Sequence, residues 1–109
     1  MSASQRNKGA RGELEVVELV RAAGWPRAHR NYDQPAEGGS DIVGGPEGVC
    51  IEIKRRAKRV DVPGAMRQAE AAAGPLEIPL VLHRVDRGAW QATLPLDELL
   101  GLLAWREQA

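Results

Sequence analysis

The sequence predicts an α/β fold in which a central mixed β-sheet is flanked by helices. Three observations support this: the chain has 109 residues, its apolar residues recur at both helical and strand-like spacings, and the two kinds of segment interleave. A chain of this length holds one domain, so we treat residues 1–109 as a single unit. Interleaved helices and short strands are typical of layered α/β folds. The expected order of elements is α-β-β-β-α-β-β-α.

The first half of the chain begins with a helix. Over residues 8–23, apolar positions recur every three or four residues, as on one face of an amphipathic helix. Gly24 is the expected end of that helix, because glycine readily adopts the backbone conformation that closes a helix. A short strand is expected over 28–32, and residues 33–40 are rich in turn formers and predict an exposed loop.

The rest of the chain predicts six further elements. Strand-like runs over 41–43 and 49–55 are separated by the segment GGPEG, which predicts a hairpin. The remaining elements are an Ala-rich helix over 64–73, strands over 78–84 and 88–94, and a Leu-rich helix over 96–105. The leucines of the last helix suit either the core or the seam of a dimer, and the sequence leaves this open.

Composition excludes several classes of protein. Cys50 is the only cysteine, which rules out internal disulfides and a cysteine-rich zinc site and favours a reducing, cytoplasmic location. No apolar run approaches the roughly 18 residues needed to span a bilayer. The first residues are basic but are not followed by the apolar segment of a secretion signal.

The charges are unevenly distributed although the formal net charge is +0. Residues 1–60 hold 11 Lys and Arg against 8 Asp and Glu, whereas residues 61–109 hold 4 against 7. Phosphate contacts are local and are screened beyond about 8–10 Å, so the distribution matters more than the sum. The basic residues gather near the start of the chain and over 54–59, which predicts contacts with a nucleic-acid backbone.

The segment over 49–55 carries the most informative polar residues. Successive side chains of a strand point to opposite faces, so the valine and isoleucines share one face while Glu52 and Lys54 share the other. If the hairpin register sets Asp41 opposite Glu52, both carboxylates project from one face. A register shifted by one residue places Asp41 on the other side, and the loop length leaves this open.

Two converging carboxylates repel each other unless a cation joins them. Mg²⁺ is commonly held by one or two carboxylates together with waters and phosphate oxygens, and Asp41 and Glu52 suit this demand, with Mn²⁺ as a substitute. The backbone carbonyl of Ile53 is a further candidate ligand. Lys54 would bind the attacking water or the scissile phosphate and stabilise the charge of the transition state. This set of residues predicts phosphodiester hydrolysis.

The same residues resemble a known nuclease family. Asp41 followed by Glu52-Ile53-Lys54 resembles the PD-(D/E)XK nuclease motif, although Ser40 stands where the motif has proline. Lys8 to Glu13 resembles the Lys-Gly-x-x-x-Glu opening of the archaeal-type Holliday junction resolvases. Gln68-Ala69-Glu70 is similar to the Gln-Ala-Glu segment of these resolvases. Together the similarities cover roughly residues 6–100.

The resemblance implies a restriction-endonuclease-like fold and a Mg²⁺-dependent homodimer that nicks opposed strands of a four-way DNA junction. It implies that Glu13 is a third carboxylate of the active site and the metal site. One candidate site per chain agrees with a dimer, because paired nicks need two sites. The residues expected to bind DNA are Arg6, Lys8, Arg11, Ser40, Arg55, Arg56, Lys58, Arg59 and Gln68.

Three other interpretations remain open from the sequence. The chain can be a repair or restriction-type nuclease of the same superfamily, because the motif residues perform the same hydrolysis on junctions and on linear duplex. It can be a DNA-binding module that has the fold but no catalysis. Since Glu-x-Lys is common on the solvated faces of strands, it can also be an α/β interaction domain with no affinity for DNA.

Overall fold

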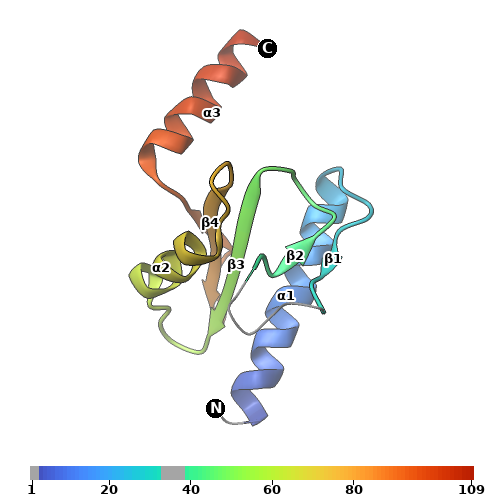
Figure 1. Ribbon diagram of the computed structural model, residues 1–109. Coiled ribbons are helices and arrows are strands. Elements are labelled where there is room, and N and C mark those ends of the chain that lie inside the picture. Colours follow the sequence, from blue (N-terminus) through green and yellow to red (C-terminus); the bar gives the residue numbers. More distant parts are fainter. Residues whose placement is uncertain (1–2, 33–38) are drawn as a thin grey trace.

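The computed structural model describes residues 3–32 and 39–109, with side chains from residue 7 onward, and shows the expected order of elements (Figure 1). The elements are α1 (Ala3–Ala23), β1 (His29–Arg30), β2 (Ile42–Val43), β3 (Val49–Arg56), α2 (Val62–Ala72), β4 (Ile78–Val85), β5 (Gln91–Thr93) and α3 (Leu96–Gln108). Most of the loop expected over 33–40 therefore lies outside the described residues. The fold is α/β, with a mixed sheet and helices on its two faces.

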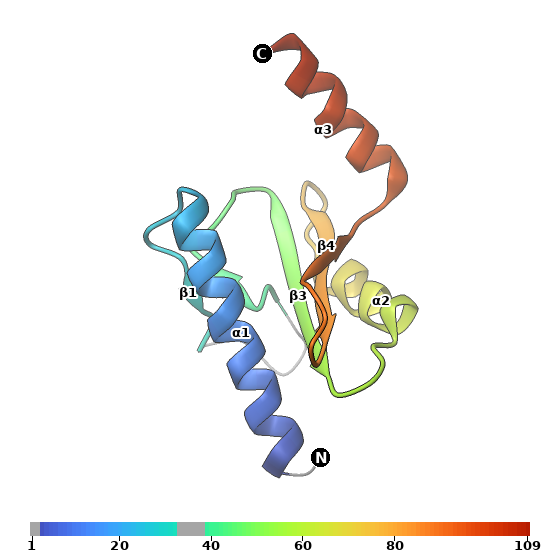
Figure 2. The same ribbon diagram turned by 180° about the vertical axis from the view of Figure 1, so that it is seen from behind.

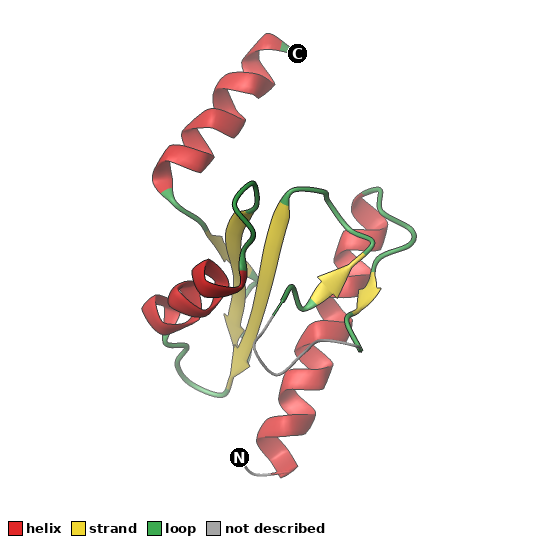
Figure 3. Cartoon of the chain, viewed as in Figure 1, coloured by secondary structure: helices red, strands yellow, loops and turns green. Residues whose placement is uncertain are grey.

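The central sheet has the strand order β3-β4-β5 (Figure 3). β3 and β4 are parallel, with Ile51 beside Leu80 and Ile53 beside Leu82, and β5 runs antiparallel to β4. Parallel neighbours need a crossover connection, and α2 supplies it. The helix is capped at its start by Asp61, whose carboxylate accepts a hydrogen bond of 3.0 Å from the Gly64 amide.

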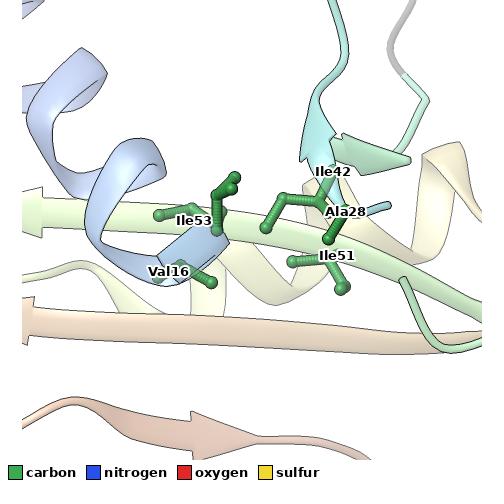
Figure 4. Close-up of a cluster of buried hydrophobic side chains, with 6 residues drawn as sticks. Val16, Ala28, Ile42, Ile51 and Ile53 are labelled. Atoms are coloured by element: carbon green, nitrogen blue, oxygen red, sulfur yellow. The ribbon is translucent and has the colours of Figure 1, made fainter. Parts of the chain in front are cut away.

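The main core lies between α1 and one face of β3 (Figure 4). Val16 and Val17 of α1 pack with Ile51 and Ile53, which confirms the predicted core face of β3. Full burial of such a side chain contributes roughly 1.5–3 kcal/mol, so these contacts fix the helix against the strand. A smaller cluster on the opposite face joins α2 to β4. The other side chains of the two clusters are Ala28, Ile42, Ala65, Ala69 and Val81.

The predicted hairpin is wrong, because β2 pairs with β1 in a separate two-stranded sheet, with Arg30 opposite Ile42. Within the described residues, no strand ladder joins β2 to β3. Gly44 explains the change of direction: it has φ +75, and a Cβ there would lie 2.5 Å from the Arg27 carbonyl oxygen. The turn therefore lies against the residues that precede β1. The contact with β3 is made just before β2, by Asp41.

Helix α1 starts at Ala3, five residues earlier than expected, and lies close to β3 at Gly12. A Cβ at Gly12 would lie 3.0 Å from the Cβ of Arg55 and 3.5 Å from the ring of Trp90. That distance is tighter than ordinary van der Waals contact, so the missing side chain permits the approach. In the described part of the chain, no helix combines the length and apolar character that crossing a membrane requires.

Helix α3 differs from the other helices because it projects from the rest of the molecule in both views (Figures 1 and 2). It is three residues longer than expected, and none of its residues is buried. The molecule measures 46 Å along its longest axis and 28–29 Å along the other two. The leucines of α3 therefore do not belong to the core of this chain.

Candidate active site

Asp41 is fixed at the edge of β3 by hydrogen bonds of its backbone and side chain. Its amide donates to the Ile51 carbonyl at 2.7 Å, and its carbonyl accepts from the Asn31 amide at 3.0 Å. Its carboxylate Oδ2 accepts from the Ile53 amide at 2.7 Å, and the residue is only 7% exposed. The backbone thus pairs Asp41 with Ile51 rather than Glu52. The carboxylate nevertheless lies along β3, where its charge acts on Glu52.

Ser40 holds this segment in place. Its hydroxyl accepts a hydrogen bond from the Ile51 amide at 3.0 Å and donates one to the Ile42 carbonyl at 2.8 Å. We expected Ser40 to donate to a phosphate, whereas here the hydroxyl proton is used within the chain. Asn31 supports the same segment through its side-chain amide, which donates to the Ser40 carbonyl at 2.9 Å. No motif marks Asn31 in the sequence, since a polar residue beside a short strand is common.

Glu52 and Lys54 project from the face of β3 that is opposite the main core, as the strand alternation predicts. The Lys54 ammonium lies 3.2 Å from Glu52 Oε1, and both side chains are largely shielded, at 19% and 14% exposure. Burial raises the pKa of Glu52, and the neighbouring charge of Asp41 raises it further. The Lys54 ammonium opposes that rise without cancelling it. Burial of the carboxyl group is therefore the largest of these influences on Glu52.

Glu13 extends from α1 towards the edge of β3 at which Asp41 lies. Arg30 donates from Nε to Glu13 Oε1 at 2.7 Å, and this bond raises the pKa of Arg30. Burial raises the pKa of Glu13, and the charge of Asp41 again adds to the rise despite Arg30. Arg30, whose guanidinium also lies 5.3 Å from the Tyr32 ring centre, was not expected from the sequence. We call Glu13, Asp41 and Glu52, with Lys54 beside them, the acidic cluster.

The oxygens of the acidic cluster suit a hard divalent cation. Ile53 donates its amide to Asp41, and the N–H and C=O of one strand residue point to the same side, so its carbonyl faces the Asp41 edge as well. Carboxylate and carbonyl oxygens are ligands that Mg²⁺ and Mn²⁺ prefer. Within residues 3–32 and 39–109, no three His, Cys, Asp or Glu side chains are arranged to hold a metal ion as they stand. Glu13 and Glu52 each face a cationic side chain, and Mg²⁺ is commonly held by one or two carboxylates.

Two of the residues expected to bind DNA instead form ion pairs on the α1 face of the sheet. Arg55, only 16% exposed, donates to Glu15 at 2.5 Å, and Lys8 donates to Asp86 at 2.5 Å. Arg84 and the indole of Trp90 also donate to Glu15, at 3.2 and 2.9 Å. The hydrogen bond from Lys8 lowers the pKa of Asp86. We call this set, Lys8, Glu15, Arg55, Arg84 and Asp86, the ion-pair cluster.

The other expected DNA contacts lie at or near the surface. Arg11, Lys58, Arg59 and Gln68 are exposed and Arg56 is partly buried, while the side chain of Arg6 lies outside the described residues. A cleft of about 490 Å³ opens beside Lys54, between the end of β3 and α2. Its polar lining includes Arg56, Gln68 and Arg67. The sequence interpretation missed Arg67, although its position directly before the Gln-Ala-Glu segment was visible.

Comparisons of the chain with protein-family models, with curated proteins and with solved structures returned no match. The functional interpretation therefore rests on the geometry of the acidic cluster and on the basic cleft beside it. These features place carboxylates, an ammonium and guanidinium groups along one edge of the sheet. Such an arrangement can bind a divalent cation and a phosphodiester next to each other.

Proposed function

We propose that this protein is a Mg²⁺-dependent DNA endonuclease of the PD-(D/E)XK superfamily with a restriction-endonuclease-like fold, and specifically a Holliday junction resolvase. The observation that carries the proposal is the acidic cluster. Three segments far apart in the sequence bring Glu13, Asp41 and Glu52 close enough for their charges to interact, with Lys54 in contact with Glu52. Partly buried carboxyl groups with raised pKa values and a charged neighbour are typical of functional sites.

In the proposed mechanism, Asp41, Glu52 and the Ile53 carbonyl would hold Mg²⁺, and Glu13 would complete the set of oxygens. When bound, Mg²⁺ would supply Lewis-acid polarisation of the phosphate and activation of water. Asp41 is held by hydrogen bonds of its amide, carbonyl and carboxylate, so its position relative to β3 is fixed. The Lys54 ammonium would orient the water and stabilise the negative charge that develops on the phosphate.

The basic cleft supports DNA as the substrate. Arg56, Arg67 and Gln68 line a single cleft that includes Lys54, so a strand whose phosphates follow the cleft would reach the acidic cluster. Arginine suits this role because its planar guanidinium binds phosphate through two hydrogen bonds. The exposed Lys58 and Arg59 follow β3 and would extend the contact. A homodimer would present two such sites to opposed strands of a four-way junction.

A cleavage assay tests the proposal. The protein is incubated in Mg²⁺ with a four-way junction, a flap and a linear duplex, and we expect the junction to be cut preferentially. Asp41→Asn and Lys54→Ala should lower the rate by about 100- to 1,000-fold while junction binding is retained. Asn at 41 still offers an oxygen to the Ile53 amide, so the segment should keep its place. Glu70→Gln, on an exposed position of α2, is the matched control and should cut normally.

The same assay separates the alternatives. Equal cutting of all three substrates would refute junction selectivity and favour a repair or restriction-type nuclease. Salt-sensitive DNA binding without cleavage in Mg²⁺ or Mn²⁺ would identify a non-catalytic binding module. Absence of any salt-sensitive DNA affinity would leave only a general interaction domain, because phosphate contacts always release counterions.

Metal binding is tested separately from cleavage by thermal unfolding in Mg²⁺ and Mn²⁺. A cation that binds only the folded state stabilises it by about 2.7 kcal/mol at 100 times its Kd. We expect the wild-type melting temperature to rise with metal and that of Asp41→Asn to respond far less. Glu15→Gln, in the ion-pair cluster, should respond as the wild type does. An equal response of all three proteins would exclude the acidic cluster as the metal site.

A further inference from the structure

Helix α3 carries an apolar surface that no part of residues 3–32 and 39–95 covers. None of its 13 residues is buried, and Trp105 and Leu96 are each 68% exposed. The other exposed apolar residues of the helix are Leu99, Leu100, Leu102 and Leu103. A helix that is apolar on several sides is normally enclosed by other protein, so this exposure predicts a partner.

A second uncovered apolar surface lies on the α1 side of the sheet. It is a groove of about 250 Å³ between the C-terminal half of α1 and strands β4 and β5. Its apolar lining includes Val16, Leu19, Val20, Trp25, Leu82 and Trp90. Leu19 and Trp25 are 54% and 40% exposed, so the groove is open on its outer side. The chain thus has both an unpartnered apolar helix and an unpartnered apolar groove.

We propose that a second copy of this chain covers both surfaces, with the two α3 helices packed antiparallel about a two-fold axis. Charge selects this direction. Asp97 and Glu98 lie in the first turn of α3 and Arg106 lies in the last. In an antiparallel pair the acidic first turn of each helix lies beside the last turn of the other, where the charges of Arg106 and Glu107 cancel, whereas a parallel pair brings four acidic side chains together. The helix dipoles also favour the antiparallel arrangement.

The spacing of the apolar residues assigns two sides of α3 to two contacts. Leu96, Leu99, Leu100 and Leu103 follow the i, i+3, i+4, i+7 pattern and form one stripe, which packs against the other α3. Leu102 and Trp105 form a second side, which lies over the apolar groove of the partner's body. The groove is needed because 13 residues are fewer than the roughly 20–30 per side of a standard interface.

This arrangement names the surface of the dimer contained in the proposed function, but it rests only on α3 and the groove. Its tests measure mass and cross-linking without DNA or metal. A dimer that cuts no DNA would defeat the nuclease proposal and leave this inference intact. A monomeric protein that cuts DNA would defeat this inference and leave the nuclease activity intact.

Analytical ultracentrifugation tests the partner. The wild-type chain of 11.8 kDa should sediment at twice that mass at micromolar concentrations. Leu103→Glu should sediment as a monomer, because it buries a charge in the leucine stripe. Leu76→Glu is the matched control and should remain a dimer, since Leu76 is 93% exposed and belongs to neither α3 nor the groove. Far-UV circular dichroism checks that both variants are folded. A monomeric wild type, or a dimeric and folded Leu103→Glu, would overturn the inference.

Disulfide cross-linking tests the direction of the pair. Asp97→Cys and Arg106→Cys are prepared as separate proteins, mixed and oxidised; the native Cys50 is buried and does not compete. An antiparallel pair predicts cross-linked dimers in the mixture and few in either protein alone. Efficient cross-linking of either variant with itself, without a gain on mixing, would show a parallel pair and refute the proposed packing.

Discussion

Two groups of charged residues each include side chains of α1 and β3, and they differ in how their charges are balanced. In the ion-pair cluster, Glu15 accepts from Arg55 and Arg84, and Asp86 accepts from Lys8. The pKa of Asp86 is lowered as a result. In the acidic cluster, the pKa values of Glu13 and Glu52 are raised although each faces a cationic side chain.

The comparison suggests two roles. The charges of the ion-pair cluster stabilise the fold, whereas those of the acidic cluster are held in position by the fold. Arg55 and Lys54 are neighbours in sequence, yet they point to opposite faces of β3 and join different clusters. The ion-pair cluster joins α1 to the sheet through three cationic side chains around two carboxylates. The acidic cluster retains a surplus of negative charge, which a divalent cation would offset. The hydrogen bond from Lys8 is the main cause of the lowered pKa of Asp86, whereas burial is the main cause of the raised pKa values of Glu13 and Glu52.

The largest expected effect comes from replacing one glutamate of each cluster by glutamine. Glu13→Gln should lower the cleavage rate by about 100-fold with little change in stability, because it removes a proposed metal ligand. Glu15→Gln should lower the free energy of unfolding by about 2 kcal/mol, discounted for its partial exposure, and keep the cleavage rate per folded molecule. Single-turnover cleavage and urea unfolding measure the two effects. If both variants lose cleavage equally, the division into two roles is wrong.

A smaller effect is expected from replacing one arginine of the cleft and one of the ion-pair cluster by alanine. Arg67→Ala should weaken DNA binding about tenfold and reduce the salt dependence by about one phosphate contact, because Arg67 lines the cleft beside Lys54. Arg55→Ala should lower stability instead, since it leaves Glu15 with fewer donors. Fluorescence anisotropy over a range of salt concentrations measures the binding. Arg27→Ala, exposed and outside the cleft, is the control. A larger loss of affinity for Arg55→Ala than for Arg67→Ala, in folded protein, would contradict the assignment.

The smallest effect is the pH dependence of stability, which should have opposite signs in the two clusters. The raised pKa of Glu52 means that its contribution to stability is present below its ordinary pKa of 4.5 and is lost as the pH rises through the folded value. Glu52→Gln should therefore become the more stable protein towards neutral pH, by about 1 kcal/mol or less. The lowered pKa of Asp86 predicts that Asp86→Asn is the less stable protein above its ordinary pKa of 3.8. Urea unfolding from pH 7 down to below 3.8 tests both signs, because the contribution of Asp86 is lost only as the pH falls below that value.

The order of elements and the core face of β3 could be predicted because they depend on local periodicity. Ile51 and Ile53 alternate with Glu52 and Lys54, and a two-residue period fixes which side chains are buried together. The same alternation also placed Arg55 on the core side, away from Lys54. The alternation would have separated Arg55 from the expected DNA contacts, because a basic side chain on the core face must pair with acidic groups of the same protein.

The pairing of β2 and the support of Asp41 could not be predicted, because both depend on contacts between distant backbone groups. Strands of two residues leave the choice of partner to turn geometry, and Gly44 directs β2 towards β1. Asn31 and Arg30 contact the candidate site from beside and within β1, and no motif marks either residue. The position of α3 could not be predicted for a related reason. The apolar residues of a helix do not reveal whether they pack against the same chain or against another one.

The close approach at Gly12 has a consequence for the residue that follows it. Glu13 extends from α1 towards the β3 edge, so the separation between helix and strand determines how far its carboxylate can reach. A methyl group at position 12 would meet the Cβ of Arg55 at 3.0 Å and push the helix outward by a few tenths of an ångström. An uncharged residue with no side chain thereby acts as a spacer, and Gly12→Ala offers a way to adjust the acidic cluster without altering any of its members.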